Sequence, residues 1–373
     1  MRLLLEGYTV LEMGSALAGP YCGRILGDLG ARVIKVEMPG TGDPARGWGA
    51  RIYNGSSAVF QAVNKEKDSL VIDFNNADDM TRLKSLIASG IDAVVQNLRP
   101  GVADDAGVGA KDCRALNPAI IYCNVSAFGA KGPLSDAAGY EPLLQAFSGI
   151  MDVTGDPDGP PARVGFSVND IGTGMWASIG ILSALLRRSQ TGEGCVVNAA
   201  LLDTALAWQT LSVATLISTG KAPKRSGLKG PIVSPNRTFE TADGLLLVTV
   251  GTDAQFKKLC ATIGLPALAT DNRFAENNDR FANDDILHAL LEEKFVTRGR
   301  HEWWRLLREA NVPAAPVQTL EEAVAHPQTV ASGILQHGPD GTHLVVGLPV
   351  TFDGERPGYR RVAPGLGEGT DDI

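Results

Sequence analysis

The first two hundred residues alternate short β-branched runs with helix-like stretches, and this alternation constrains the fold more than any other feature of the chain. The candidate strands are almost continuously apolar, as in VIKV and AIIYC, and cover residues 8–13, 32–37, 69–74, 92–96 and 120–125. Helical patterns lie between them, over 20–29, 77–89 and 110–116. Strands of this kind, separated by helices, form parallel sheets that are covered on both faces. The pattern therefore predicts an α/β fold with a doubly wound parallel sheet.

The second half of the chain predicts a smaller domain. Two apolar helices, 172–188 and 201–219, are separated by the turn TGEG and a short strand at 195–198. Residues 220–236 are rich in Gly, Pro and Lys, as linkers often are. A strand at 245–251 and helices at 253–263, 283–295 and 300–310 follow. We predict a large Rossmann-like domain over 1–200 with 340–373 packing back on it, a long helix and linker over 201–235, and a small α/β domain over 236–339.

Composition narrows the class of protein. The net charge of −8 argues against non-specific nucleic-acid binding. Five scattered cysteines, none spaced as CxxC, indicate a reduced cytoplasmic protein with no zinc site. Acidic residues come too early for a signal peptide. The longest uncharged runs, Ile171–Leu186 and Thr204–Gly220, are shorter than the roughly 20 apolar residues of a membrane span, so we expect buried helices.

Two absences limit the chemistry. All five histidines lie at position 288 or later, so a site in the first 287 residues needs another general base. The turn after the first strand reads GSALAGP rather than GxGxxG, which argues against a nicotinamide dehydrogenase. Its small residues either allow a ligand to approach the backbone or simply make a tight strand-to-helix turn.

Asp170, in the motif NDIGTGM, is the strongest candidate for chemistry. It lies just before a long apolar helix, where one interpretation is an N-cap that accepts a backbone hydrogen bond. The other is an accessible nucleophile, kept ionised by the helix dipole and free N–H groups. In that second interpretation Gly172 and Gly174 leave space for a large substrate.

Ten motifs in chain order resemble family III CoA-transferases, the group that contains formyl-CoA transferase and carnitine CoA-transferase, with α-methylacyl-CoA racemases as relatives. The motifs are ALAGPYCGRILGDLGARVIKVE, GDPARGW, QNLRPGV, the LNP before AIIYCNVSAFG, GYEPLLQAFSGIM, NDIGTGM, TGEG, TADG, NVPAAPV and LGEGTDDI. The resemblance covers essentially the whole chain. It implies an enzyme that moves CoA between an acyl-CoA donor and a carboxylic acid acceptor.

The resemblance also implies catalytic residues. Asp170 matches the aspartate that attacks the donor thioester and forms a mixed anhydride, after which CoA passes through an aspartyl thioester to the new acid. Glu141 matches an acidic position near the reacting centre, although a Glu there is also an ordinary helix-start charge. Tyr140 stands where the racemases carry His, so racemisation lacks one of its two acid/base groups. An α-carbon racemase or epimerase and a non-catalytic CoA-binding homologue remain the alternatives.

The CoA site is where this sequence departs from the family. Leu17 and Ala18 match positions that border the CoA tail, Asn97 and Leu98 match the nucleotide and pantetheine channel, and Ile72 matches an adenine contact; Tyr140 completes this predicted set. Positions that supply cations to the phosphates hold Met38, Asn75 and Asp105 instead. The candidates to replace them are Arg46, Lys65, Lys67, Arg99 and Lys111, of which Lys67 and Arg99 are preferred. Residues 227–234 also lack the glycine run that covers the formyl-CoA transferase site.

The resemblance further implies that CoA is a substrate and that no metal or permanently bound cofactor is needed. It implies an interlocked homodimer whose active site lies between the large domain of one subunit and the small domain of the other. The identity of the donor and acceptor acids is left open.

Overall fold

The larger of two compact units is built on one parallel sheet. The computed structural model describes residues 3–49, 51–53, 56–230, 232–339, 341 and 343–370. Residues 1–151, 163–223 and 327–373 form the larger unit, and residues 152–162 and 224–326 form the smaller one. The six strands run in the order β5-β2-β1-β6-β7-β8, and every neighbouring pair is parallel. Their bounds are β1 Thr9–Met13, β2 Arg32–Glu37, β5 Lys67–Val71, β6 Ala93–Gln96, β7 Ile121–Ser126 and β8 Cys195–Ala200.

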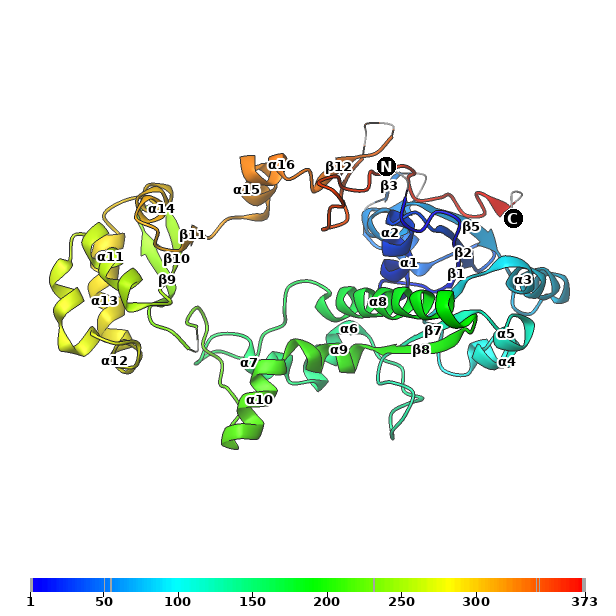
Figure 1. Ribbon diagram of the computed structural model, residues 1–373, viewed down its shortest axis with the longest axis horizontal. Coiled ribbons are helices and arrows are strands. Elements are labelled where there is room, and N and C mark those ends of the chain that lie inside the picture. Colours follow the sequence, from blue (N-terminus) through cyan, green and yellow to red (C-terminus); the bar gives the residue numbers. More distant parts are fainter. Residues whose placement is uncertain are drawn as a thin grey trace. The chain divides into compact units, whose positions relative to one another are not determined.

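Helices cover both faces of this sheet, which confirms the doubly wound prediction. Helices α1 (Ala18–Asp28) and α8 (Val168–Thr191) pack side by side on one face, over a core that includes Val10, Val33 and Val95 (Figure 1). Helices α3 (Ala77–Gly90) and α5 (Ala110–Leu116) contribute to the core on the other face. Successive apolar side chains of a strand are therefore buried on opposite faces of the sheet, which explains why the strands are almost continuously apolar.

Glycine sets the geometry of α1 at two places. Gly30 follows the helix end with φ +110°, a conformation that glycine adopts without steric cost. On the facing helix, a Cβ at Gly174 would lie 2.8 Å from the carbonyl oxygen of Ala18 and 3.1 Å from the nitrogen of Cys22. The absence of a side chain at Gly174 therefore lets the backbones of α1 and α8 come into contact.

Three differences from the sequence prediction bear on the site and on the helices around it. Strand β5 begins at Lys67, two residues before the predicted start. Helix α8 begins at Val168, four residues before the predicted start, and Gly172 and Gly174 pack against neighbouring helices inside it. The predicted helix 201–219 is two helices, α9 (Leu201–Trp208) and α10 (Thr210–Thr219), separated at Gln209, whose ψ of 17° departs from helical values.

Shorter elements complete the larger unit. They are the 3₁₀ turn Pro44–Gly47, β3 Arg51–Tyr53, β4 Ser56–Ser57, α2 Ala58–Asn64, α4 Val102–Asp105, α6 Glu141–Phe147, α16 Pro327–Ala331, β12 Leu335–His337 and β13 Leu344–Val346, while α7 Ile150–Val153 spans the boundary between the units. The C-terminal segment lies against β5: the N–H of Gly367 donates to Ser69 Oγ at 3.0 Å, and Arg361 pairs with Asp68 at 2.6 Å.

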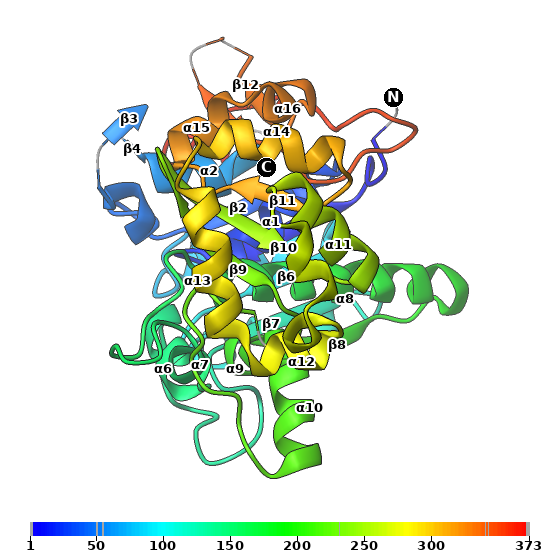
Figure 2. The same ribbon diagram turned by 90° about the vertical axis from the view of Figure 1, so that its left-hand side faces the viewer.

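The smaller unit combines an antiparallel sheet, β11-β10-β9, with helices (Figure 2). Its elements are β9 Asn236–Thr241, β10 Gly244–Thr249, α11 Asp253–Thr262, α12 Asn277–Ala282, α13 Asp284–Phe295, α14 Arg300–Glu309, β11 Ala314–Pro316 and α15 Leu320–Ala325. Phe239, Phe295 and Trp303 are at the centre of its core. Across the described ranges of both units, no helix is both long and apolar enough to cross a membrane.

Candidate active site

A cavity of about 950 Å³ opens at the carboxyl ends of the central strands in the larger unit. The chain leaves β1 for α1 and β2 on one side, whereas β6 and β7 extend the sheet on the other side. This reversal between β1 and β6 is the position at which open parallel sheets bind ligands. The residues that follow these strands form the wall: Ser15, Ala16, Leu17, Ala18, Asn97, Leu98, Arg99, Pro100, Ser126 and Ala127.

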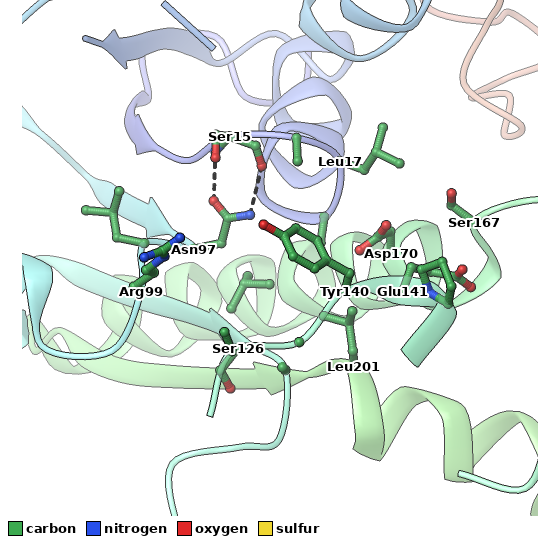
Figure 3. Close-up of a pocket in the computed structure, with 18 of the residues that line it drawn as sticks. Ser15, Leu17, Asn97, Arg99, Ser126, Tyr140, Glu141, Ser167, Asp170 and Leu201 are labelled. Atoms are coloured by element: carbon green, nitrogen blue, oxygen red, sulfur yellow. Dashed lines mark hydrogen bonds between the residues drawn. The ribbon is translucent and has the colours of Figure 1, made fainter. Parts of the chain in front are cut away.

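Asn97 holds the loop between β1 and α1. Its side-chain oxygen accepts from the Ser15 N–H at 2.8 Å, and its side-chain nitrogen donates to the Ser15 carbonyl at 2.9 Å (Figure 3). The next residue, Ala16, has φ +64°, which is costly for a residue with a side chain. The Ala16 N–H donates to Asp43 Oδ1 at 3.1 Å. Two side chains from other parts of the chain therefore fix this part of the cavity wall.

Beneath the loop lies a buried group of charges, Glu12, Lys35, Asp43 and Lys67, here called the Lys35 network. The Lys35 ammonium lies 2.9 Å from Glu12 Oε1, 2.9 Å from Asp43 Oδ2 and 2.7 Å from the Gly14 carbonyl. Burial favours the neutral amine, but the carboxylates of Glu12 and Asp43 raise the pKa of Lys35 overall. The Lys35 ammonium therefore stays charged, and its contacts tie the cavity loop to the sheet.

Two carboxylates stand together where α6 and α8 begin. Glu141 is the first residue of α6 and is buried; its Oε1 accepts from Gln145 Nε2 at 2.8 Å and from the Asn169 N–H at 3.4 Å. Asp170 is half-buried and lines the cavity. Both labelled side chains lie on the same side of Tyr140 in Figure 3, away from Asn97 and Arg99.

The structure corrects two details of the sequence interpretation of Asp170, its place at the helix start and its ionisation. The N-cap of α8 is Ser167, and Asp170 is the third helical residue, so it does not cap the helix. Burial, with a smaller contribution from the nearby Glu141, raises the pKa of Asp170 from an ordinary value of 3.8 to about 7. The helix start therefore does not hold this carboxyl firmly ionised. Gly172 does not open space either, because a Cβ there would lie 2.5 Å from the Trp208 ring.

Most of the predicted site residues line this cavity. They are Leu17, Ala18, Asn97, Leu98, Arg99, Tyr140, Glu141 and Asp170. Ile72 and Met38 line a second cavity of about 310 Å³, which shares Ser15, Pro44 and Leu98 with the first. Three further lining residues lie on irregular segments: Trp48, which ends the motif GDPARGW, and Arg163 and Phe166, for which the sequence offered no signal. No group of three or more His, Cys, Asp or Glu within the described ranges is arranged to hold a metal ion.

The predicted role of Lys67 in phosphate binding is incompatible with its place in the structure. It is buried, and its ammonium contacts Glu12 Oε2 at 2.7 Å, the Pro20 carbonyl at 2.8 Å and Asn64 Oδ1 at 2.8 Å. All three N–H donors are used, and none faces either cavity. Burial lowers the pKa of Lys67 to about 8 despite the attraction of Glu12.

Two other candidate cations are also paired. Arg46 binds Glu37 at 2.7 Å, and Lys65 pairs with Asp28. Arg99 lines the cavity, and no residue in the described part of the chain binds its guanidinium, whereas the exposed Lys111 on α5 lines neither cavity.

The family model for CoA-transferase family III matches residues 5–370. The chain is 38% identical to the acetyl-CoA:oxalate CoA-transferase of Acetobacter aceti, over 97% of this chain and 93% of that protein. It is 35% identical to the succinate–glutarate CoA-transferase of Agrobacterium fabrum, over 98% and 93%. A crystal structure of a CaiB/BaiF family protein from Brucella suis superposes with a TM-score of 0.89 at 36% identity, covering 99% of this chain and 98% of that one.

These matches place the molecule in the transferase class of enzymes. The chain belongs to CoA-transferase family III.

Proposed function

We propose that this enzyme moves CoA from an acyl-CoA donor to a carboxylic acid acceptor through covalent intermediates on Asp170. One observation carries the proposal. Asp170 is a half-buried carboxyl at the cavity wall, its raised pKa has burial and a second carboxyl as causes, and its side chain has no hydrogen bond to any residue that the structure describes. Carboxylates without a structural partner that face a cavity are candidates for chemistry, whereas structural carboxylates are usually paired.

The proposed reaction has four steps. An oxygen of Asp170 attacks the thioester carbonyl, the C–S bond breaks, and CoA leaves as thiolate from a mixed anhydride. The thiolate attacks the Asp170 carbonyl of the anhydride, which releases the donor acid and leaves an aspartyl thioester. The acceptor carboxylate attacks that thioester and expels the thiolate. The thiolate then attacks the acceptor carbonyl, which yields the new acyl-CoA and restores the Asp170 carboxylate.

The electrostatics support this role. With a pKa of about 7, a large share of the Asp170 carboxyls is ionised at neutral pH, and each is more basic than an ordinary carboxylate. Glu141, held by Gln145 and the Asn169 N–H, supplies a negative neighbour at a fixed position. We propose that Glu141 adjusts the reactivity of Asp170 in this way.

CoA is proposed to lie along the wall formed by residues 15–18 and 97–99. Leu17, Ala18, Asn97, Leu98 and Tyr140 would border the pantetheine. Arg99, exposed and unpaired among the described residues, is suited to a phosphate group. The second cavity, with Ile72 and Met38, is apolar enough for the adenine and shares its lining with the first.

A homodimer is part of the proposal. None of the ten residues of α10 is buried, and Leu211 and Ile217 are 77% and 78% exposed. Trp176 and Ile179 of α8 are 47% and 49% exposed. Apolar surface of this extent normally mediates association. Light scattering of the purified protein at micromolar concentration should give twice the mass of the 39.3 kDa chain.

Chemical trapping tests the covalent step. The protein is mixed with acetyl-CoA without an acceptor and then treated with hydroxylamine or borohydride. Peptide mass spectrometry should find the modification on Asp170, and Asp170→Asn should abolish it together with turnover, by roughly a thousandfold or more.

Asp203 provides the matched control, because it is also the third residue of a helix, α9, but lines neither cavity. Asp203→Asn should leave trapping unchanged. Turnover retained by a folded Asp170→Asn protein would contradict the proposal. Exchange of the α-proton of a 2-methylacyl-CoA in deuterated water, without an acceptor, would indicate a racemase instead.

A further inference from the structure

Four charged side chains line the large cavity, two carboxylates and two cations. Glu141 and Asp170 are the carboxylates, and Arg99 and Arg163 are the cations. Within the described ranges, neither guanidinium has an ion-pair or hydrogen-bond partner. Two cations therefore face the cavity with all of their N–H donors available to a ligand, although two carboxylates line the same space.

The two arginines belong to different parts of the wall. Arg99 follows β6 and lies with Asn97, on the side of the cavity away from Asp170 (Figure 3). Arg163 precedes Val164, whose N–H donates to Gln145 Oε1 at 2.8 Å. The other end of the Gln145 amide donates to the Val164 carbonyl at 3.3 Å and to Glu141 at 2.8 Å. The backbone that carries Arg163 is therefore anchored through one side chain to the Glu141–Asp170 side.

The charge on this side determines which acids can bind. An acceptor must bring a carboxylate next to Asp170 and Glu141, and like charges at short range oppose its binding. A guanidinium offers a planar pair of donors that matches a carboxylate. Arg163 lines the same cavity but is not among the interactions that set the pKa of Asp170, so it does not neutralise the reacting carboxylate of a bound acid. It does offer a specific partner to a second carboxylate on the same molecule, at a distance from the reacting one.

We propose that Arg163 binds the distal carboxylate of a short dicarboxylic acid, so that acceptors of this class are preferred over monocarboxylic acids of equal length. This inference rests on the proposed function, since it names the substrate class of the same site. The reacting carboxylate attacks the Asp170 thioester as described above, and Arg163 forms no covalent bond. Arg163 is in this account a specificity-determining residue.

Matched pairs of acceptors test the inference. Acetyl-CoA is the donor, and the acceptors are malonate with propionate, succinate with butyrate, and glutarate with pentanoate, with products identified by mass spectrometry. The wild-type protein should use at least one dicarboxylate at least tenfold better than its partner. Arg163→Gln should raise the KM for that acid by about 10- to 100-fold, as expected for loss of a charge-assisted contact. The kcat should change little, and Arg163→Lys should recover part of the loss.

Two variants give the comparison its control. Arg99→Gln should raise the KM for acetyl-CoA and leave the ratio between paired acceptors unchanged. Arg114→Gln, an exposed change on α5 that touches neither cavity, should alter none of these values.

Three results would overturn the inference: equal use of both acids in every pair, an equal loss for both acids in Arg163→Gln, or a rise confined to the KM for acetyl-CoA. Failure of the proposed function looks different, because the wild-type protein would then form no Asp170 adduct and transfer CoA to no acid.

Discussion

The Lys35 network and the Asp170–Glu141 pair place carboxylates in the same unit of the protein under opposite electrostatic conditions. In the network, Glu12 and Asp43 each contact the Lys35 ammonium at 2.9 Å, and Glu12 also contacts Lys67. At the cavity, Asp170 has a carboxyl neighbour and no cation within the interactions that set its pKa. Both clusters lie within a few residues of the cavity wall, but only the second faces it.

The difference separates structural charge from reactive charge. Buried carboxylates that hold a loop in place are neutralised, since an unpaired buried charge is costly. A carboxyl that must form and break bonds gains basicity from the absence of such a partner. The free-energy cost of burying this unpaired carboxylate is expressed as its raised pKa, and interactions elsewhere in the fold must offset that cost.

Breaking the network should have the largest effect on stability. Lys35→Met leaves Glu12 and Asp43 without their shared cation in a site closed to water. We expect the free energy of unfolding to fall by about 3 to 5 kcal/mol, the usual cost of breaking a buried ion pair from one side. Chemical denaturation followed by circular dichroism measures it. Lys258→Met, on the exposed face of α11, should change stability by less than about 0.5 kcal/mol. A loss below 1 kcal/mol for Lys35→Met would remove the basis of the comparison.

Removing the unpaired carboxyl of Asp170 should stabilise the protein, whereas breaking the Lys35 network should destabilise it. Below about pH 4, Asp170 is protonated in both folded and unfolded chains, so Asp170→Asn and the wild type should be equally stable. Between about pH 4 and 7 only the unfolded wild type ionises, which lowers its stability. At pH 8 the Asp170→Asn variant should therefore be more stable than the wild type by roughly 2 to 4 kcal/mol, since each pKa unit corresponds to about 1.4 kcal/mol. Asp203→Asn should show no such growth with pH, and a variant less stable than the wild type at pH 8 would contradict the raised pKa.

The smallest effect concerns the pH dependence of turnover. If ionised Asp170 is the nucleophile, kcat/KM should rise with pH around an apparent pKa of about 7. Glu141→Gln removes the negative neighbour but not the burial, which is the larger cause. The rising limb should move to lower pH by no more than about one unit. Stopped assays from pH 5 to 9 measure the shift, and an unmoved limb would mean that Glu141 does not act on Asp170 through its charge.

The sequence predicted the parallel sheet and its helices well, because nearly continuous apolar runs have few other uses in a chain of this length. It failed where glycine packs tightly. The predicted helix began at Gly172, whereas α8 begins at Val168, and Gly172 and Gly174 lie inside it where it contacts other helices. Tertiary packing outweighs intrinsic propensity at these positions, and no local pattern reports it.

The site residues were predicted from motifs, so the prediction was accurate only where a motif exists. Asp170, Glu141, Tyr140 and Asn97 lie at one cavity as expected. Lys67 was a candidate phosphate ligand, and the strand that contains it was predicted to begin at residue 69. The strand begins at Lys67 itself and directs the ammonium into the Lys35 network. Arg163 lies on an irregular segment with neither motif nor periodicity, so only its position in space identifies it.

The contact at Gly174 has a consequence for how such an enzyme can change. Asp170 lies one helical turn before Gly174, where the backbone of α8 contacts the backbone at the start of α1 directly. Substitutions that reshape the remainder of the cavity cannot easily alter the spacing between α8 and α1 at this contact. Under the proposed function, Asp170 and the wall opposite it can therefore stay in register while Arg163, Phe166 or Trp48 are exchanged, so that new acids are accommodated without rebuilding the proposed reactive centre.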